Sequence, residues 1–219
     1  MSEYQYIAFR AIDRPLTDSE LAFAEKQSTR AKISRWSFTN EYNFGDFRGD
    51  ANGLLRHGYD VHLHYANFGV RKIALRFPVG LPFPRAVWSQ YGDARRFGWQ
   101  KDPEGNGGIL TLRPFHEPSE IEEIWAPGEY VEDVVEIRNQ LVAGDLRALY
   151  LLWLCAAYDD YLDPPELIEP PVPGGLAELT HSAAALLEFF GLNPLMLAAA
   201  SEGTPSASAR QDEEQRIAG

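Results

Sequence analysis

The sequence predicts an α+β protein with a mixed N-terminal half and an all-helical C-terminal half of about four helices. Apolar and polar residues alternate in several short segments before residue 117, which is the pattern of half-buried strands. Beyond Pro118 the apolar residues recur at helical spacing instead. With 219 residues, of which 45% are hydrophobic, the chain can bury a core. We therefore expect an α+β domain in residues 1–117, an acidic helical domain in residues 118–200 and a flexible or truncated tail in residues 201–219.

The N-terminal half has the pattern β-α-β-α-β-β, followed by an extra hairpin. Residues 4–12 are rich in aromatic and branched side chains, which is a strand composition. Thr17 and Glu20 form a Thr-x-x-Glu capping box, which predicts a helix from residue 18 to about 28. Aromatic and polar residues then alternate from 33 to 42, and this is the clearest strand pattern in the chain.

The next elements are predicted from a cap, a periodicity and a turn. Asp50 is placed to cap a short helix through Arg56. Residues 59–65 fit either a strand or a helix, but strict alternation of apolar and polar residues covers more of them, so we expect a strand. Residues 67–69 then turn the chain into a second strand, which ends at Pro78.

Glycines and prolines punctuate residues 81–113, so this region is expected to be loop with one hairpin, whose arms are residues 97–101 and 109–113. Helical periodicity begins after Pro118. The expected helices cover residues 130–141, 146–157 and 176–190, and a short fourth helix begins at Pro194.

Charge is distributed unequally along the chain. The net charge is -12, yet residues 1–117 carry 16 Lys and Arg against 13 Asp and Glu, whereas the rest carries 4 against 19. This imbalance suggests two surfaces with different electrostatic roles, complementary to each other across the junction. Cys155 is the only cysteine and lies in an apolar run too short to span a bilayer, so no disulfide, no cysteine-rich zinc site and no membrane segment are expected. A cytoplasmic location fits best.

Asp60, His62 and His64 are the candidate metal ligands. A strand would point all three side chains to one face, and a carboxylate with two imidazoles is a ligand set for iron, manganese or zinc. Neighbouring positions on one strand cannot all wrap one ion closely, however, and a fourth donor would have to come from elsewhere. The alternative is the solvated face of an edge hairpin.

The segment from residue 40 to 50 is the candidate binding loop. It combines acids, amides, aromatics and glycines, a mixture that often lines binding sites. The residues with the chemistry for such a role are Glu41, Tyr42, Asp46 and Arg48. The alternative is a structural turn that its glycines and its capping Asp50 already explain.

Other functional classes find less support. Basic and aromatic residues mix between Arg71 and Trp99, but their small charge excess is joined to an acidic half that a nucleic acid would repel. We therefore expect these arginines to face that acidic half. No Gly-x-Ser-x-Gly motif or accessible cysteine signals nucleophilic catalysis, and the acidic residues 158–163 lack calcium-loop spacing. No cofactor is therefore expected.

Four segments together resemble a family of uncharacterised bacterial cytosolic proteins that has no established function. They are Ala11-Ile12-Asp13-Arg14-Pro15-Leu16-Thr17, Gly45-Asp46-Phe47-Arg48-Gly49-Asp50, Ala66-Asn67-Phe68-Gly69 and Gly144-Asp145-Leu146-Arg147-Ala148-Leu149-Tyr150-Leu151. The resemblance implies a bacterial cytosolic protein and a fuller C-terminus than this chain has. It implies no activity.

The function expected from these observations is a non-enzymatic interaction or regulatory role. In this hypothesis the α+β part and the acidic helical part present one composite surface to a protein partner. The alternatives are a metal-dependent enzyme that uses Asp60, His62 and His64, and a nucleic-acid-binding accessory protein. Neither a membrane nor a particular oligomeric state is predicted.

Overall fold

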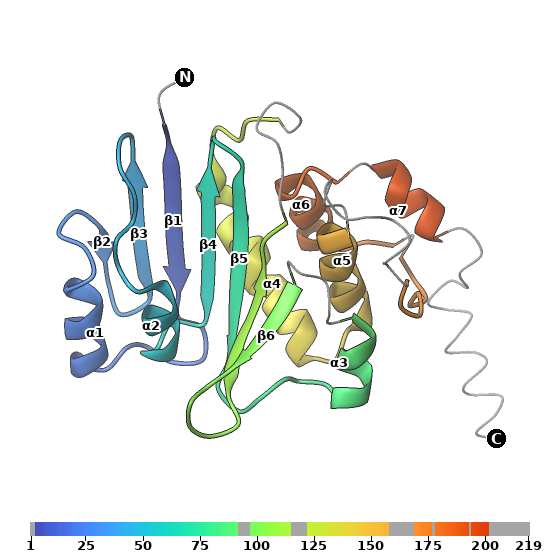
Figure 1. The fold of residues 1–219 in the computed structure, drawn as a ribbon, viewed down its shortest axis with the longest axis horizontal. Coiled ribbons are helices and arrows are strands. Elements are labelled where there is room, and N and C mark those ends of the chain that lie inside the picture. Colours follow the sequence, from blue (N-terminus) through green and yellow to red (C-terminus); the bar gives the residue numbers. More distant parts are fainter. Residues whose placement is uncertain are drawn as a thin grey trace.

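The computed structural model describes residues 3–91, 97–114, 122–157, 169–176, 178–192 and 194–201. Its strands are β1 (Gln5–Arg10), β2 (Lys32–Ile33), β3 (Ser37–Tyr42), β4 (Val61–Ala66), β5 (Val70–Phe77), β6 (Phe97–Lys101) and β7 (Gly108–Leu112). They form one antiparallel sheet in the order β2-β3-β1-β4-β5-β7-β6, shown in Figure 1. Together with the helices, this sheet confirms the predicted α+β class.

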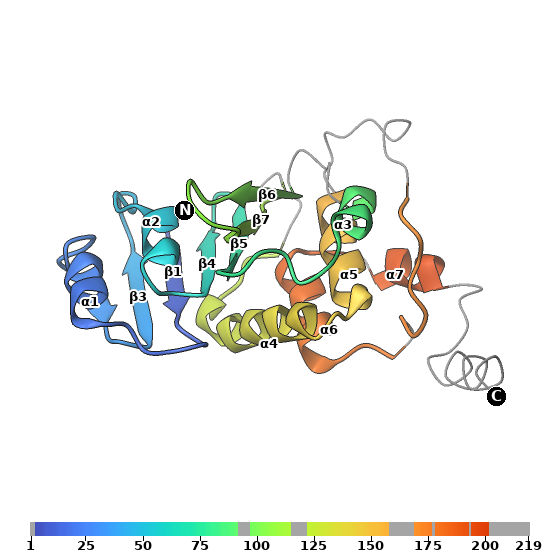
Figure 2. The same ribbon diagram turned by 90° about the horizontal axis from the view of Figure 1, so that it is seen from below.

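The helices of the described residues cover both faces of the sheet. They are α1 (Asp18–Glu25), α2 (Ala51–Arg56), α3 (Arg85–Tyr91), α4 (Val131–Val142), α5 (Leu146–Ala157), α6 (His181–Phe189) and α7 (Pro194–Ser201), with a 3-10 turn η1 (Pro127–Tyr130) before α4. In Figure 2 the sheet is seen edge on, with α2 on one side and α4 on the other. None of these helices is long and apolar enough to cross a membrane.

Local signals placed the early elements correctly. Thr17 Oγ1 accepts a hydrogen bond from the backbone N–H of Glu20, and the Glu20 carboxylate accepts one from the backbone N–H of Thr17, so the predicted capping box begins α1. Asp50 accepts from the N–H of Gly53 and caps α2. The strand preferred over residues 59–65 is present as β4, which begins at Val61, so Asp60 lies just before the strand.

Three predicted elements need correction. The strand expected from residue 33 to 42 is divided into β2 and β3, because the Ser34 hydroxyl accepts from the N–H groups of Trp36 and Ser37 and turns the chain. Trp36 is consequently 51% exposed. The loop expected from residue 81 contains α3, which starts where the Pro84 carbonyl accepts from two following N–H groups.

The third correction concerns the C-terminal half, which is less helical than predicted. The helix expected from residue 176 begins only at His181, because Thr180 caps it by accepting from the N–H of Ala183. Residues 122–126 and 169–175 are described and are not helical. The acidic segment 158–163 and nearly all of the predicted tail, 202–219, lie outside the described residues.

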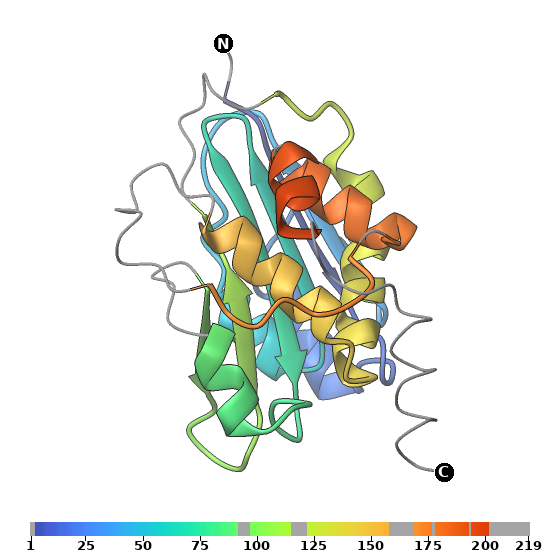
Figure 3. The same ribbon diagram turned by 90° about the vertical axis from the view of Figure 1, so that its right-hand side faces the viewer.

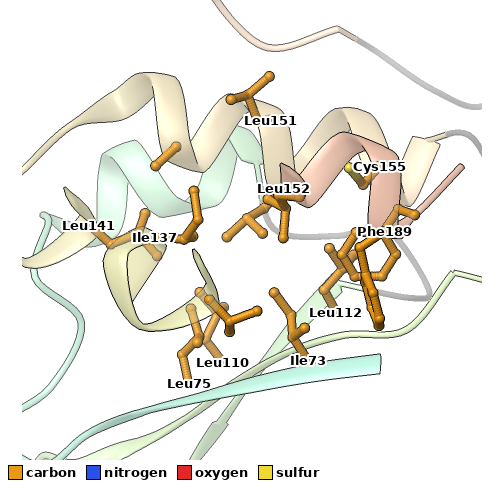
Figure 4. Close-up of a cluster of buried hydrophobic side chains, with 14 of the residues drawn as sticks. Ile73, Leu75, Leu110, Leu112, Ile137, Leu141, Leu151, Leu152, Cys155 and Phe189 are labelled. Carbon is orange, nitrogen blue, oxygen red and sulfur yellow. The ribbon is translucent and has the colours of Figure 1, made fainter. Parts of the chain in front are cut away.

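The larger hydrophobic core lies between the sheet and the C-terminal helices. Apolar side chains of β4, β5 and β7 meet those of α4, α5 and α6. Figure 4 labels residues of β5, β7 and these three helices. They are Ile73, Leu75, Leu110, Leu112, Ile137, Leu141, Leu151, Leu152, Cys155 and Phe189. A smaller core on the opposite face packs Ile7, Phe9 and Phe38 against α1 and α2. The residues before and after Pro118 thus contribute to one continuous core.

Candidate functional site

A pocket of about 860 Å³ lies where the end of the sheet meets the segment before α4 and helices α6 and α7. Figure 3 shows α6 and α7 on the same side of the sheet as α5. The apolar lining of the pocket includes Ile124, Trp125, Leu179, Leu187, Leu192 and Leu197. This volume lies in the range of pockets that bind small organic molecules or short chain segments.

Arg71 is the basic residue of the pocket. Along β5 the side chains of Ile73, Leu75 and Phe77 point into the larger core, and Arg71 continues the same face. Its side chain is only 2% exposed. Burial lowers the pKa of its guanidinium group. An arginine therefore occupies a position that the strand pattern reserves for an apolar residue.

Hydrogen bonds hold the Arg71 guanidinium group between two distant segments. Nη1 donates to the carbonyl of Phe189 at 2.7 Å, and Nη2 donates to the carbonyl of Glu122. Its third nitrogen, Nε, has no hydrogen-bond partner, and within the described part of the chain it is the only buried side-chain nitrogen or oxygen atom in that condition. Because a buried N–H without an acceptor is costly, an acceptor atom of a ligand would stabilise this site.

Two tyrosines fix the walls of the pocket. The Tyr65 hydroxyl accepts from the N–H of Ile124 at 2.9 Å and holds the segment before η1 against β4. The Tyr130 hydroxyl donates to Glu188 Oε1 at 2.9 Å and joins η1 to α6. Burial and the neighbouring Glu188 raise the pKa of Tyr130 to about 12, so this hydroxyl keeps its proton at neutral pH.

The rim of the pocket is acidic. Four glutamates among its lining residues are exposed, against the single buried guanidinium of Arg71; they are Glu122, Glu123, Glu129 and Glu188. Trp125 lies beside them and is 87% exposed. Large exposed aromatic residues at pocket rims are frequent anchors for binding partners. The described lining contains no Ser, Thr, Cys, His or Lys, so its polar side chains are the four carboxylates, the Tyr130 hydroxyl, the Trp125 indole and the Arg71 guanidinium group.

Asp60 and His62 lie away from the pocket and have partners of their own. The Asp60 carboxylate accepts from the N–H groups of Ile12, at 2.6 Å, and Asp13, at 3.1 Å. Burial raises its pKa. The His62 ring stacks on Phe9 with centroids 4.1 Å apart, and its Nδ1 donates to the Ala8 carbonyl. Burial lowers the pKa of His62 well below its usual value, so the imidazole is neutral.

His64 completes the candidate metal set but has a different neighbourhood. Its Nε2 is 3.0 Å from Gln5 Oε1. Within the described ranges no group of three or more His, Cys, Asp and Glu residues is arranged to hold a metal ion. The alternative reading of Asp60, His62 and His64 as the solvated face of an edge hairpin is wrong, because β4 is a central strand and Asp60 and His62 are buried.

The candidate binding loop lies at the end of β3. Tyr42 is half-buried and ends the strand, and Glu41, Asp46 and Arg48 are exposed. The Asp46 carboxylate accepts from Gln5 Nε2 at 2.6 Å. Gln5 therefore connects one residue of the predicted loop to His64 of the predicted metal set.

Sequence patterns did not identify the pocket, and they did not identify Arg71 as a binding residue. One signal was present, because Arg71 continues the inward-facing alternation of Ile73, Leu75 and Phe77. The convergence of Trp125 and Glu188 on Arg71 carried no such signal, since their separation in sequence is set by tertiary packing. Of the basic residues expected to face the acidic half, Arg71 does so, whereas Arg76 pairs with Asp102 at 2.6 Å.

No protein-family model matches the chain, and neither the curated proteins nor the solved structures include one with significant similarity to it.

Proposed function

We propose that this protein is a non-enzymatic binding protein that holds a basic, apolar segment of a partner protein in the pocket beside Arg71. The observation that carries the proposal is an apolar pocket of about 860 Å³ ringed by four exposed glutamates. Apolar walls favour aliphatic or aromatic side chains of the partner. The acidic rim favours its lysines or arginines. In the same proposal, the protein acts in the cytosol of a bacterium.

Charge favours a cationic occupant over an anionic one. Four carboxylates outnumber the one guanidinium, which already donates to two carbonyl groups. An anionic ligand would meet like charge at the rim, whereas a lysine or arginine side chain would be attracted to it. The Nε group of Arg71 needs only a neutral acceptor, and a peptide carbonyl oxygen is one.

Both parts of the chain contribute to this surface. Arg71 comes from β5, and the remaining lining residues come from the segments and helices after residue 121. The arrangement supports the composite binding surface expected from the charge distribution, because a partner would contact both parts at once. Binding would therefore also stabilise their contact with each other.

The test uses three synthetic peptides of one length, titrated into the intact protein by isothermal calorimetry. Leucine alternates with lysine in the first, with glutamine in the second and with glutamate in the third. We expect the lysine peptide to bind with a Kd in the micromolar range, roughly tenfold more tightly than the glutamine peptide, and its affinity to fall with added salt. The glutamate peptide should not bind.

Two variants test whether the lysine peptide binds in the pocket. Glu129→Gln, on the rim, should weaken the lysine peptide roughly two- to fivefold, which corresponds to about 0.5–1 kcal/mol for an exposed ion pair. Glu25→Gln is the matched control, because Glu25 is an exposed glutamate of α1 outside the pocket lining. Equal binding of all three peptides, no binding of any, or equal effects of the two substitutions would refute the proposal.

A further inference from the structure

We propose a second binding site on the opposite face of the sheet, where Lys72 and Arg113, together with His64, bind the oxyanion of a small phosphate or carboxylate. Neighbouring residues of a strand point to opposite faces. Arg71 therefore enters the helix-covered pocket while Lys72, the next residue of β5, faces the other side. The two sites are independent, and the second does not rest on the proposed peptide binding.

Three polar side chains, Asn40, His64 and Lys72, lie in one row across this end of the sheet, with the apolar Ile7 between the first two. In the strand register Asn40 pairs with Ile7, Ile7 with His64 and His64 with Lys72, so these residues of β3, β1, β4 and β5 lie side by side. Arg113 directly follows β7, the next strand. Its positive charge acts on both Lys72 and His64. Directly opposed residues have Cβ atoms about 5 Å apart, close enough to share one ligand.

Two residues further along each strand, the same face is mainly apolar, with His62 as the exception. There Phe38 pairs with Phe9, and His62, which stacks on Phe9, pairs with Ala74. Apolar residues would also serve stability at the polar end, because a buried polar group contributes little unless it is paired. At the other end of this face the charged groups are paired, because Arg76, four residues along β5 from Lys72, forms an ion pair with Asp102 at 2.6 Å. A charged side chain without such a partner is typical of a site where function overrides stability.

Hydrogen bonds orient the His64 ring. Gln5 Nε2 donates to Asp46 Oδ1, so Gln5 Oε1 is the acceptor for His64 Nε2–H at 3.0 Å. In the neutral ring Nδ1 then carries the lone pair. Lys72 has no ion-pair partner in the part of the chain that the structure describes, and the residue is half-buried.

Four groups set the electrostatics at His64, and they also predict how pH affects binding. Burial, as the largest cause, and the positive charges of Lys72 and Arg113 together lower the pKa of His64 to about 4, and the charge of Asp46 opposes them. His62 beside it is neutral. A bound anion would offset the two positive charges and raise the pKa of His64. Since the bound form then takes up a proton more readily, affinity for phosphate, which stays anionic, should increase as pH falls toward 4. A carboxylate ligand is itself protonated in that range, so its affinity should not show the same increase.

The experiment follows the imidazole resonances of histidine-labelled protein by NMR during titration with inorganic phosphate, acetate and, as a control for ionic strength, chloride. A His64→Gln variant assigns the His64 signals. We expect phosphate or acetate at millimolar concentration to raise the pKa of His64 by about one unit. Phosphate acting at lower concentration would identify a phosphate ligand, and acetate acting at lower concentration a carboxylate.

Substitutions of two lysines test whether the anion that raises the pKa of His64 binds at Lys72. Lys72→Met should abolish the shift, Lys72→Arg should retain it, and Lys101→Met, which removes an exposed lysine of β6, should leave it unchanged. The Lys72→Arg variant keeps the test valid if Lys72→Met fails to fold. An equal response to chloride, no response to any anion, or a response that persists without the charge at Lys72 would overturn the proposal.

Discussion

At the scale of single residues, buried charged groups take one of two forms. Arg138 is 4% exposed in its side chain, yet it donates to both Asp13 oxygens and to the Arg76 carbonyl, and it lies 3.6 Å from Asp60. Its neighbours thus satisfy it fully. Arg71 lacks one partner. The difference separates a charge that stabilises the fold from one that is available to a ligand.

Replacement of Arg138 by methionine should destabilise the protein by about 3 kcal/mol, because it leaves the buried Asp60 carboxylate without its neighbouring charge. Urea unfolding followed by tryptophan fluorescence measures this loss. The matched control is Arg147→Met, which removes an arginine that pairs with Asp145 in a more exposed place. We expect that control to cost less than about 1 kcal/mol. Equal losses of stability in the two variants would contradict the assignment of Arg138 as a buried charge that stabilises the fold.

The capping carboxylate of α1 predicts a pH dependence. Hydrogen bonds from Arg14 and Thr17 lower the pKa of Glu20 from its usual 4.5 to about 2. A lowered pKa stabilises the folded protein above pH 4.5, and this contribution is lost as pH falls toward 2.

Glu20→Gln should therefore reduce the free energy of unfolding by about 1 kcal/mol at pH 7, and the difference from the parent protein should shrink below pH 4.5. Glu25→Gln, on the same helix, serves as control and should have no comparable effect. A difference that stays constant down to pH 3 would exclude the ionised cap as its source.

At the scale of elements, the sequence predicted those whose signals are local. The capping box of Thr17 and Glu20 located the start of α1, and alternation located β4 and β5. The turn at Ser34 and the helix α3 were missed, because a side-chain hydrogen bond and tertiary packing of Tyr91 outweigh the local pattern. Periodicity predicted where the candidate site residues lie in the strands. It could not predict their hydrogen-bond partners, because these partners are distant in sequence.

Helix α5 is the element on which the larger core depends most. Nine of its residues are buried, and they meet the sheet as well as α4 and α6. Leu152→Ala should cost about 2–5 kcal/mol because it leaves a cavity among packed side chains. Leu146→Ala, at the exposed start of the same helix, should cost less than about 1 kcal/mol. Thermal or urea unfolding distinguishes them, and equal costs would show that the core closes around the smaller side chain.

At the scale of the whole molecule, the sheet and the C-terminal helices depend on each other. Residues 1–117 expressed alone would expose the apolar face that carries Leu63, Ile73 and Leu75. We expect this fragment to aggregate or to bind a hydrophobic dye, and to be rescued by co-expression with residues 118–219. A soluble fragment as stable as the intact chain would show that the predicted division at Pro118 separates independent units.

The single cysteine gives this interdependence a kinetic signature. Cys155 lies on α5 within the shared core, is 1% exposed, and burial raises the pKa of its thiol, so both access and thiolate formation are suppressed in the folded protein. A thiol reagent can modify it only when the helices move away from the sheet. The rate at which Cys155 is modified in native buffer therefore reports how often the core opens.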